Sequence, residues 1–201
     1  MRLILVRHAQ SQGNEQKLVQ GHTDYQLSER GRTEAQLLAQ RFKNEQIDRI
    51  YVSDLSRAVQ TAQPLLEHHE NTTVTYDARL RERNYGEFET LTKREVVENG
   101  YAPGAGTWID PPGGEHLDTF TERVTSFLDE LTKTHYGETI LLISHSGFIT
   151  RTLLTLAQAS DDEYRTYRPP NASVTNIEFD LGKNHELKLL HCCEHLEQTR
   201  T

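Results

Sequence analysis

The chain has 201 residues, of which 35% are hydrophobic and 26% charged, a composition typical of one globular domain with a substantial core. Its formal net charge is −8, so a general nucleic-acid binder, which would carry a basic excess, is not expected. Its apolar runs are too short for a bilayer span or a signal-peptide core, so we expect no membrane association and a cytoplasmic location.

The predicted elements alternate between strands and helices. The first, residues 3–6 (LILV), is a continuous apolar run, typical of a strand buried on both faces. Further strands are predicted at residues 49–53, 74–76, 139–144, 174–179 and 187–192, and helices at 28–42, 56–69, 93–99, 117–131 and 147–157. This alternation predicts one α/β domain over residues 1–201 with a mainly parallel sheet.

The segment from about residue 84 to residue 116 differs from the rest. It holds the Gly- and Pro-rich stretch GYAPGAGTWIDPPGG, which includes Trp108, and it has no Lys or Arg between Glu98 and Gly114. Long loops in compact domains are often functional lids. We therefore expect a lid that contributes to substrate specificity.

Three of the predicted strands end near cations and imidazoles. Residues 3–6 run into Arg7 and His8, residues 49–53 are soon followed by Arg57, and residues 139–144 run into His145. Alone, the Arg7-His8 pair also fits an exposed strand end. Ligands bind beyond the carboxyl ends of parallel strands, however, and two guanidinium groups at one site need an anion between them. A phosphate fits the planar guanidinium fork, so the pattern predicts a phosphate site.

The motifs around these residues resemble those of the histidine phosphatase superfamily, also called the phosphoglycerate mutase-like family. The similarity begins with RHAQSQGN at residues 7–14 and follows the family's order over nearly the whole chain. The further motifs are QGHTD (20–24), LSERG (27–31), SDLSRAVQTA (53–62), LRE (80–82), GEFE (86–89), PGGE (112–115) and SHSG (144–147). Ala9 and Thr90 stand where the family more often has Gly. The resemblance implies a three-layer αβα sandwich with a mainly parallel central sheet.

The resemblance also assigns roles to individual residues. It implies that His8 is a nucleophile that forms a phosphohistidine, and that Arg7 and Arg57 hold the phosphoryl oxygens. His145 is expected to donate a hydrogen bond to the same oxygens. Further phosphate or substrate contacts are expected from Asn14, Gln20, Gly21, Thr23 and Ser146. No cofactor and no metal ion is expected.

Glu82 matches the position of the family's general acid and base. It would protonate the leaving alkoxide and later take a proton from water. Without the resemblance, Glu82 could equally be a surface glutamate in a charged run. Glu87 and Glu89 are expected to be structural or capping groups.

The sequence leaves the substrate open. The stretch ERNYG (82–86) with LTK (91–93) is similar to a mutase motif and makes Arg83, Tyr85 and Lys93 candidate substrate contacts. The short lid without Lys or Arg suits hydrolysis better than mutase transfer, so we favour a phosphatase for small phosphomonoesters. The alternatives are a cofactor-dependent phosphoglycerate mutase, a protein phosphohistidine phosphatase, and a non-catalytic module that binds phosphorylated ligands. Whether the chain forms a homodimer is also left open.

The string HCCEH at residues 191–195 matches the H-x-x-E-H motif of some metalloproteases. That motif needs a helix, whereas here it follows an apolar strand. On a strand, residues four apart lie roughly 13 Å from each other, too far to share a zinc ion. We therefore expect no metal site. The adjacent Cys192 and Cys193 would point to opposite faces of the strand, so we expect reduced thiols.

Overall fold

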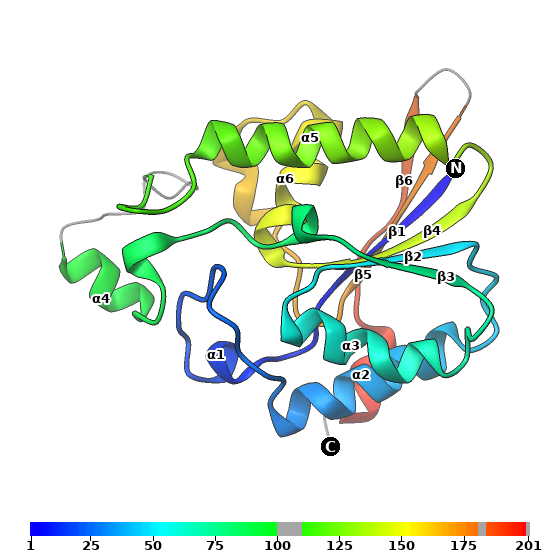
Figure 1. Cartoon of the computed structure of the whole chain (residues 1–201), viewed down its shortest axis with the longest axis horizontal. Coiled ribbons are helices and arrows are strands. Elements are labelled where there is room, and N and C mark those ends of the chain that lie inside the picture. The colour runs from blue at the N-terminus through cyan, green and yellow to red at the C-terminus, as the bar shows by residue number, and fades with distance from the viewer. Residues whose placement is uncertain (100–109, 181–183, 200–201) are drawn as a thin grey trace.

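The computed structural model describes residues 1–99, 110–180 and 184–199. A six-stranded sheet in the order β3-β2-β4-β1-β5-β6 runs through the molecule (Figure 1). Its strands are β1 (Arg2–Arg7), β2 (Arg49–Val52), β3 (Thr73–Tyr76), β4 (Thr139–Ser144), β5 (Val174–Phe179) and β6 (His185–Cys192). The first four are parallel to one another, and β5 and β6 add an antiparallel edge. The prediction of a mainly parallel sheet is confirmed.

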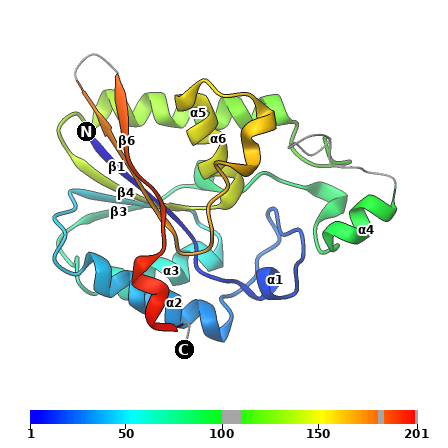
Figure 2. The same ribbon diagram turned by 180° about the vertical axis from the view of Figure 1, so that it is seen from behind.

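Helices cover both faces of the sheet, as Figures 1 and 2 show. The pair α2 (Glu29–Phe42) and α3 (Ser56–Leu66) packs on one face, and the pair α5 (Leu117–Thr134) and α6 (Ser146–Ala157) packs on the other. The shorter helices are α1 (Gln12–Glu15) and α4 (Lys93–Glu98), with 3₁₀-helices η1 (Ala78–Leu80), η2 (Gly86–Phe88), η3 (Asp161–Arg165) and η4 (Glu194–Thr199). This is the expected three-layer αβα sandwich.

The central strand β1 shows why its sequence is apolar throughout. Leu3 and Leu5 pack in the core beneath α5 and α6, whereas Ile4 and Val6 pack in the core beneath α2 and α3. Successive side chains of a strand point to opposite faces, so a strand covered on both sides needs four apolar residues in a row. The same burial fixes the register of β1 against β4, which brings Arg7 opposite Ser144.

The expected lid falls partly outside the described residues, because Trp108 and its neighbours are not among them. The two ends of the segment are joined: the Glu115 N–H donates to the Asn84 carbonyl oxygen at 2.9 Å, and Arg83 Nε donates to the Glu115 carbonyl oxygen at 2.8 Å. Between these ends, the described part contains η2 and α4. Among the described residues, no helix combines the length and the apolar character that crossing a bilayer requires.

Candidate active site

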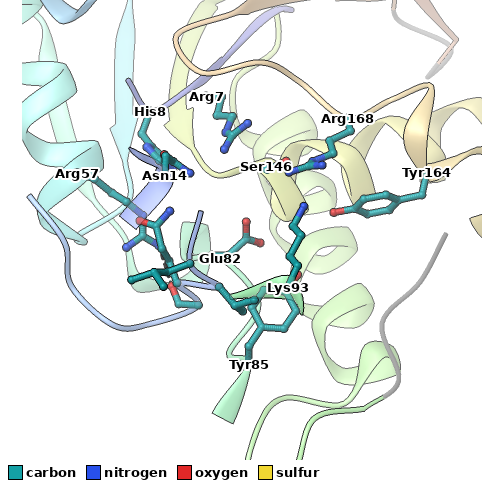
Figure 3. A pocket seen from close by; sticks show the side chains of 14 residues that line it. Arg7, His8, Asn14, Arg57, Glu82, Tyr85, Lys93, Ser146, Tyr164 and Arg168 are labelled. Carbon is teal, nitrogen blue, oxygen red and sulfur yellow. Dashed lines mark hydrogen bonds between the residues drawn. The ribbon is translucent and has the colours of Figure 1, made fainter. Parts of the chain in front are cut away.

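The carboxyl ends of β1, β2 and β4 converge on a cavity of about 110 Å³ (Figure 3). Arg7 ends β1, His8 follows it directly, and Arg57 lies in the first turn of α3, just after β2. Arg7, His8 and Arg57 line the cavity. Its wall also contains seven further residues that the sequence singled out as catalytic or substrate groups: Asn14, Gln20, Gly21, Glu82, Tyr85, Lys93 and Ser146. The predicted cluster at the strand ends is therefore present in three dimensions.

The His8 ring is held in one orientation by the main chain. It is 3% exposed, and its Nδ1 lies 2.7 Å from the carbonyl oxygen of Ala9. A carbonyl oxygen can only accept, so Nδ1 carries the proton and Nε2 keeps its lone pair. Burial, followed by the charges of Arg57 and Arg7, lowers the pKa of His8 well below its usual value of 6.5. His8 is therefore a neutral imidazole with a free lone pair at physiological pH.

Arg57 is 1% exposed and is fixed by three hydrogen bonds. Its Nη1 donates to the Thr23 carbonyl oxygen at 3.0 Å and its Nη2 to the Gly21 carbonyl oxygen at 2.7 Å. Its Nε donates to Nδ1 of His145 at 3.2 Å. Burial lowers its pKa to about 10, so the guanidinium is still charged at neutral pH. A fixed cation beside His8 is what binding of a phosphoryl group requires.

Arg7 is the second buried cation and is held less completely. Its Nη1 donates to the Pro169 carbonyl oxygen at 2.8 Å, and its buried Nε has no partner among the described residues. Burial, and then the charge of Arg168, lowers its pKa to about 10. A buried guanidinium nitrogen without a partner is costly unless a ligand accepts its hydrogen bond. Arg7 thus has donor capacity left for an anion.

His145 differs from the expectation that it donates to the phosphoryl oxygens. Its Nδ1 accepts from Arg57, so its proton lies on Nε2, which donates to Ser53 Oγ at 2.7 Å. Both ring nitrogens are therefore engaged within the protein, and His145, whose ring centre lies 5.1 Å from that of His8, is not among the residues that line the cavity. Burial and the charge of Arg57 lower its pKa well below 6.5. In this structure His145 orients Arg57, and donation to a ligand would require Arg57 to release Nδ1.

Glu82 is held by two main-chain donors. Its Oε1 accepts from the Arg83 N–H and its Oε2 from the Gly147 N–H, both at 2.9 Å. The second donor belongs to the first turn of α6, where helix N–H groups have no partner within the helix. A Cβ on Gly147 would lie 2.1 Å from Glu82 Oε1, so glycine is needed for this close approach. The carboxyl group points into the cavity opposite Arg7 (Figure 3).

Two further side chains present donors to the cavity. Asn14 accepts hydrogen bonds on Oδ1 from Ser11 and from Asn171, which leaves its amide N–H₂ group to face the cavity. Ser146 Oγ is buried and has no partner among the described residues. Buried polar atoms of this kind are normally satisfied by water or a ligand. Together with Arg7 they form a set of donors suited to an oxyanion.

A family model described as the histidine phosphatase superfamily, branch 1, matches residues 3–191. The chain belongs to this superfamily. Phosphoserine phosphatase 1 of Hydrogenobacter thermophilus is 34% identical over 199 residues, which are 96% of this chain and 93% of that protein. Phosphoglycerate mutase-like protein 4 of Arabidopsis thaliana is 32% identical over 204 residues, 98% and 87% of the two chains.

Solved structures of histidine phosphatases are similar over nearly the whole chain. A mycobacterial glucosyl-3-phosphoglycerate phosphatase has a TM-score of 0.82 and 29% identity, covering 96% of this chain and 99% of that one. Phosphoserine phosphatase from Entamoeba histolytica, in complex with 3-phosphoglyceric acid, has a TM-score of 0.84 and 26% identity, covering 97% and 98%. The expected fold and the expectation of an enzyme of this superfamily are confirmed.

Thr23 is not among the residues that line the cavity of this histidine phosphatase. Its N–H and Oγ1 both donate to Glu89 Oε2, at 2.7 and 2.6 Å, while Glu89 Oε1 accepts from the N–H groups of His22 and Tyr85. Glu89 therefore fixes the loop whose carbonyl oxygens hold Arg57. This is the structural role that the sequence suggested for Glu89, and Thr23 takes part in it.

Arg83 lies beside the cavity and not in its wall. Its side chain is 2% exposed, donates to the Glu115 carbonyl oxygen and pairs with Asp110, and its guanidinium carbon lies 5.9 Å from the centre of the Tyr85 ring. In this structure Arg83 connects the ends of the lid segment. Tyr85 and Lys93, the other two residues of the mutase-like motif, do line the cavity.

Sequence reasoning missed Tyr164 and Arg168, which line the cavity on the side of Lys93 (Figure 3). They belong to η3 and to the loop before β5, a region without a recognised motif. The only signal in the sequence was Arg168, a basic residue that follows Arg165 and directly precedes Pro169 and Pro170. Burial raises the pKa of Tyr164 to about 12, so its phenol keeps its proton and can donate.

The sequence analysis placed the HCCEH string on a strand, but in the structure only its first part is strand. β6 ends at Cys192 and η4 begins at Glu194, so the string turns between the two elements. His195 Nδ1 lies 3.0 Å from Arg41 Nη1, which donates a hydrogen bond to it. The lone pair of Nδ1 is therefore occupied, and the charge of Arg41 would repel a metal cation. Burial and the charge of Arg41 lower the pKa of His195 to about 4. Among the described residues, no three His, Cys, Asp or Glu side chains are placed to hold a metal ion.

Proposed function

We propose that this histidine phosphatase hydrolyses small phosphomonoesters through a phosphohistidine on Nε2 of His8. The observation that carries the proposal is the bond from His8 Nδ1 to the Ala9 carbonyl oxygen, which leaves the Nε2 lone pair free in a cavity with Arg7, Arg57 and Glu82. A neutral nucleophile, two cations for the phosphoryl oxygens and one carboxyl group are the groups that such a transfer needs.

In the first step, Nε2 of His8 attacks phosphorus as the ester P–O bond breaks. The departing alkoxide oxygen takes the proton of Glu82, which becomes a carboxylate. In the second step, Glu82 takes a proton from water, the hydroxyl oxygen attacks phosphorus, and the P–N bond breaks. His8 returns to its neutral form and inorganic phosphate leaves. Arg7 and Arg57 hold the charge of the phosphoryl oxygens throughout.

The named relatives support small phosphorylated metabolites as substrates. They include phosphoserine phosphatases and a glucosyl-3-phosphoglycerate phosphatase. The second candidate function is phosphoglycerate mutase transfer, which is favoured by relatives of that name at 32% identity over 80% of this chain and by Tyr85 and Lys93 in the cavity wall. Hydrolysis is preferred because the segment from Glu98 to Gly114 carries no Lys or Arg to retain a bisphosphorylated intermediate.

A phosphoenzyme experiment tests the proposal. The protein is mixed with radiolabelled aryl phosphate or phosphoserine, quenched and assayed for acid-labile protein-bound phosphate, and released phosphate is measured in parallel. We expect labelling and phosphate release in the wild type and neither in His8→Ala. Release without any phosphohistidine would overturn the mechanism. A rate of phosphoglycerate isomerisation above that of phosphate release would favour the mutase.

We further propose that the protein acts in the cytoplasm. Cys192 and Cys193 are not joined in a disulfide, as is usual in a reducing compartment.

A further inference from the structure

Asn171, in the loop between η3 and β5, contacts two residues of the active site with one amide nitrogen. Its Nδ2 donates to the His8 carbonyl oxygen and to Asn14 Oδ1, both at 3.0 Å. A side-chain amide nitrogen carries two hydrogens, and these two bonds use both. Asn171 is not among the residues that line the catalytic cavity, so it reaches the site through other residues of the protein.

The orientation of the Asn14 amide depends on the donors that its Oδ1 receives. Ser11 Oγ lies 3.0 Å from Asn14 Oδ1 and 2.6 Å from Gln20 Oε1. A hydroxyl group has one proton, and the shorter contact takes it. Asn14 Oδ1 then keeps the Ser11 N–H at 3.2 Å and Asn171 Nδ2 at 3.0 Å. Of these two donors, Asn171 is the closer.

This orientation decides what Asn14 offers to an anion. Asn14 lies in the wall of the catalytic cavity beside His8 (Figure 3). With Oδ1 bound to Asn171, the N–H₂ group faces the cavity and can donate to a phosphoryl oxygen. The reversed amide would present a carbonyl oxygen, which cannot donate and repels an anion. A contact outside the cavity therefore sets the sign of a group inside it.

The turn that carries Asn171 leaves it little freedom. Pro169 and Pro170 precede it, and their rings fix φ at both positions. The Ser173 N–H donates to the Pro170 carbonyl oxygen at 3.3 Å and closes the turn. Ala172 has a φ of +52°, in the left-handed region that favours glycine, and its side chain is fully buried. Such a conformation persists where the surrounding structure holds it, so the turn presents Asn171 in a fixed position.

We propose that Asn171 is a positioning residue, which holds the amide of Asn14 in the orientation that donates to the phosphoryl group. The inference rests on the proposed phosphatase function and adds to it a residue that does not touch the reacting atoms. Loss of Asn171 frees the Asn14 amide to turn. The His8 carbonyl oxygen is affected less, because the Ala172 N–H still donates to it at 3.3 Å.

A double-mutant cycle on Asn14 and Asn171 tests the proposal. Asn14→Ala should lower kcat/KM on an aryl phosphate by about 10- to 100-fold, the usual effect of losing a hydrogen bond to a charged group. Asn171→Ala should lower it by about fivefold or more, within the range of couplings between residues in contact. In the Asn14→Ala background, the same Asn171→Ala change should cost less than about twofold, because the amide that it positions is gone.

Vanadate binding, measured by calorimetry, supplies a readout that does not need turnover. Vanadate resembles the phosphoryl group and has no ester part, so its affinity reports on the phosphate site alone. Asn171→Ala should weaken vanadate binding by about the same factor as kcat/KM. Asn171→Asp should weaken it at least as much, since a carboxylate of nearly the same size accepts hydrogen bonds and cannot donate to Asn14 Oδ1.

Asn176→Ala is the matched control. Asn176 is a half-buried asparagine on β5 whose Oδ1 accepts from Arg2 Nε at 3.3 Å, and it does not line the catalytic cavity. Its replacement should leave kcat/KM and vanadate affinity unchanged. If Asn171→Ala does not fold, Asn171→Ser carries the same test, because serine suits a turn and is too short to replace both bonds.

Two results would overturn the role of Asn171. One is an equal loss from Asn171→Ala in the wild-type and Asn14→Ala backgrounds, because Asn171 would then act independently of Asn14. The other is unchanged vanadate affinity in Asn171→Ala. Full activity in Asn14→Ala would also remove the proposal and leave the phosphatase function standing. If the wild type binds vanadate but hydrolyses no ester, the proposed function fails, and the vanadate affinities still decide the role of Asn171.

Discussion

In the proposed mechanism His8 and Glu82 have separate tasks, and the surroundings of each residue fit its task. His8 has one nitrogen bound to a carbonyl oxygen and the other free, in the field of two arginines. Glu82 has both carboxyl oxygens bound by main-chain N–H groups, so its position is set by the backbone of Arg83 and Gly147. One residue can therefore attack phosphorus without being deprotonated first, while the other is positioned to carry a proton to and from the ester oxygen.

Replacing Glu82 by glutamine should affect substrates unequally. The variant keeps the nucleophile and both arginines but cannot supply a proton. An alkyl phosphate needs that proton to leave, whereas an aryl phosphate with an acidic phenol needs little help. General acid–base catalysis is typically worth about 10²–10⁴-fold, so Glu82→Gln should lose about that factor in kcat on alkyl esters and clearly less on the aryl ester.

Glu87→Gln is the matched control for this comparison, because Glu87 is exposed and carries the same charge close by in the chain. Equal losses on both esters in Glu82→Gln would remove Glu82 from the acid role. The other carboxylates near the site are already engaged, since Glu89 binds the loop at Thr23 and Glu115 pairs with Arg123 at 2.7 Å.

Among the elements, the parallel strands made the site predictable. Apolar runs identified β1, β2 and β4, and because parallel strands end at the same edge of a sheet, the residues after them had to meet. The contributions of α1, Tyr164 and Arg168 could not be predicted in this way. A four-residue helix has no periodicity to detect, and the approach of η3 to the cavity depends on how the chain folds back over α6.

The hydrogen-bond partners of His145 could not be predicted from its motif. Its position after β4 was predicted, and it lies next to His8 as expected. Its hydrogen bonds to Arg57 and Ser53 depend on side-chain packing between three elements, which no local pattern encodes. A motif therefore indicates which residues meet and leaves open which of them contacts the ligand.

The amino end of α6 provides a test of how the site is positioned. Gly147 has no space for a Cβ beside Glu82 Oε1, so Gly147→Ala should displace the carboxyl group and lower kcat on alkyl phosphates by at least about tenfold. Alanine at a helical position is otherwise neutral or stabilising, so the melting temperature should change little. Thr155→Ala on the exposed side of the same helix is the control and should retain full activity. Wild-type activity in Gly147→Ala would contradict the view that Glu82 depends on this contact.

For the molecule as a whole, the proposed phosphate site requires charged groups to be buried. Arg7 and Arg57 are both almost inaccessible, and His8 and His145, which are buried in the same region, are neutral rings. The fold tolerates this arrangement because loop carbonyl oxygens accept from the guanidinium groups and the imidazoles stay uncharged. Protonation of either imidazole would place a third cation in the same buried volume.

Stability should therefore depend on pH through these two histidines. Their pKa values are lowered on folding, so below the unfolded value of about 6.5 the unfolded chain binds protons that the folded chain does not. The free energy of unfolding should be at its full value above about pH 6.5 and should fall as the pH drops from there towards the folded pKa values. Each histidine contributes a slope of up to about 1.4 kcal/mol per pH unit in that interval.

Denaturant unfolding of the wild type and of His8→Asn, measured from about pH 8 to about pH 5, tests this expectation. Carboxylates elsewhere in the chain titrate in both proteins and cancel in the difference. Asparagine cannot take up a proton, so the variant should lose less stability than the wild type on acidification, and the two curves should approach each other as the pH falls below about 6.5. Parallel curves would show that His8 is not held neutral by the fold. The free lone pair proposed for catalysis would then need another explanation, because its availability at and below neutral pH depends on the same lowered pKa.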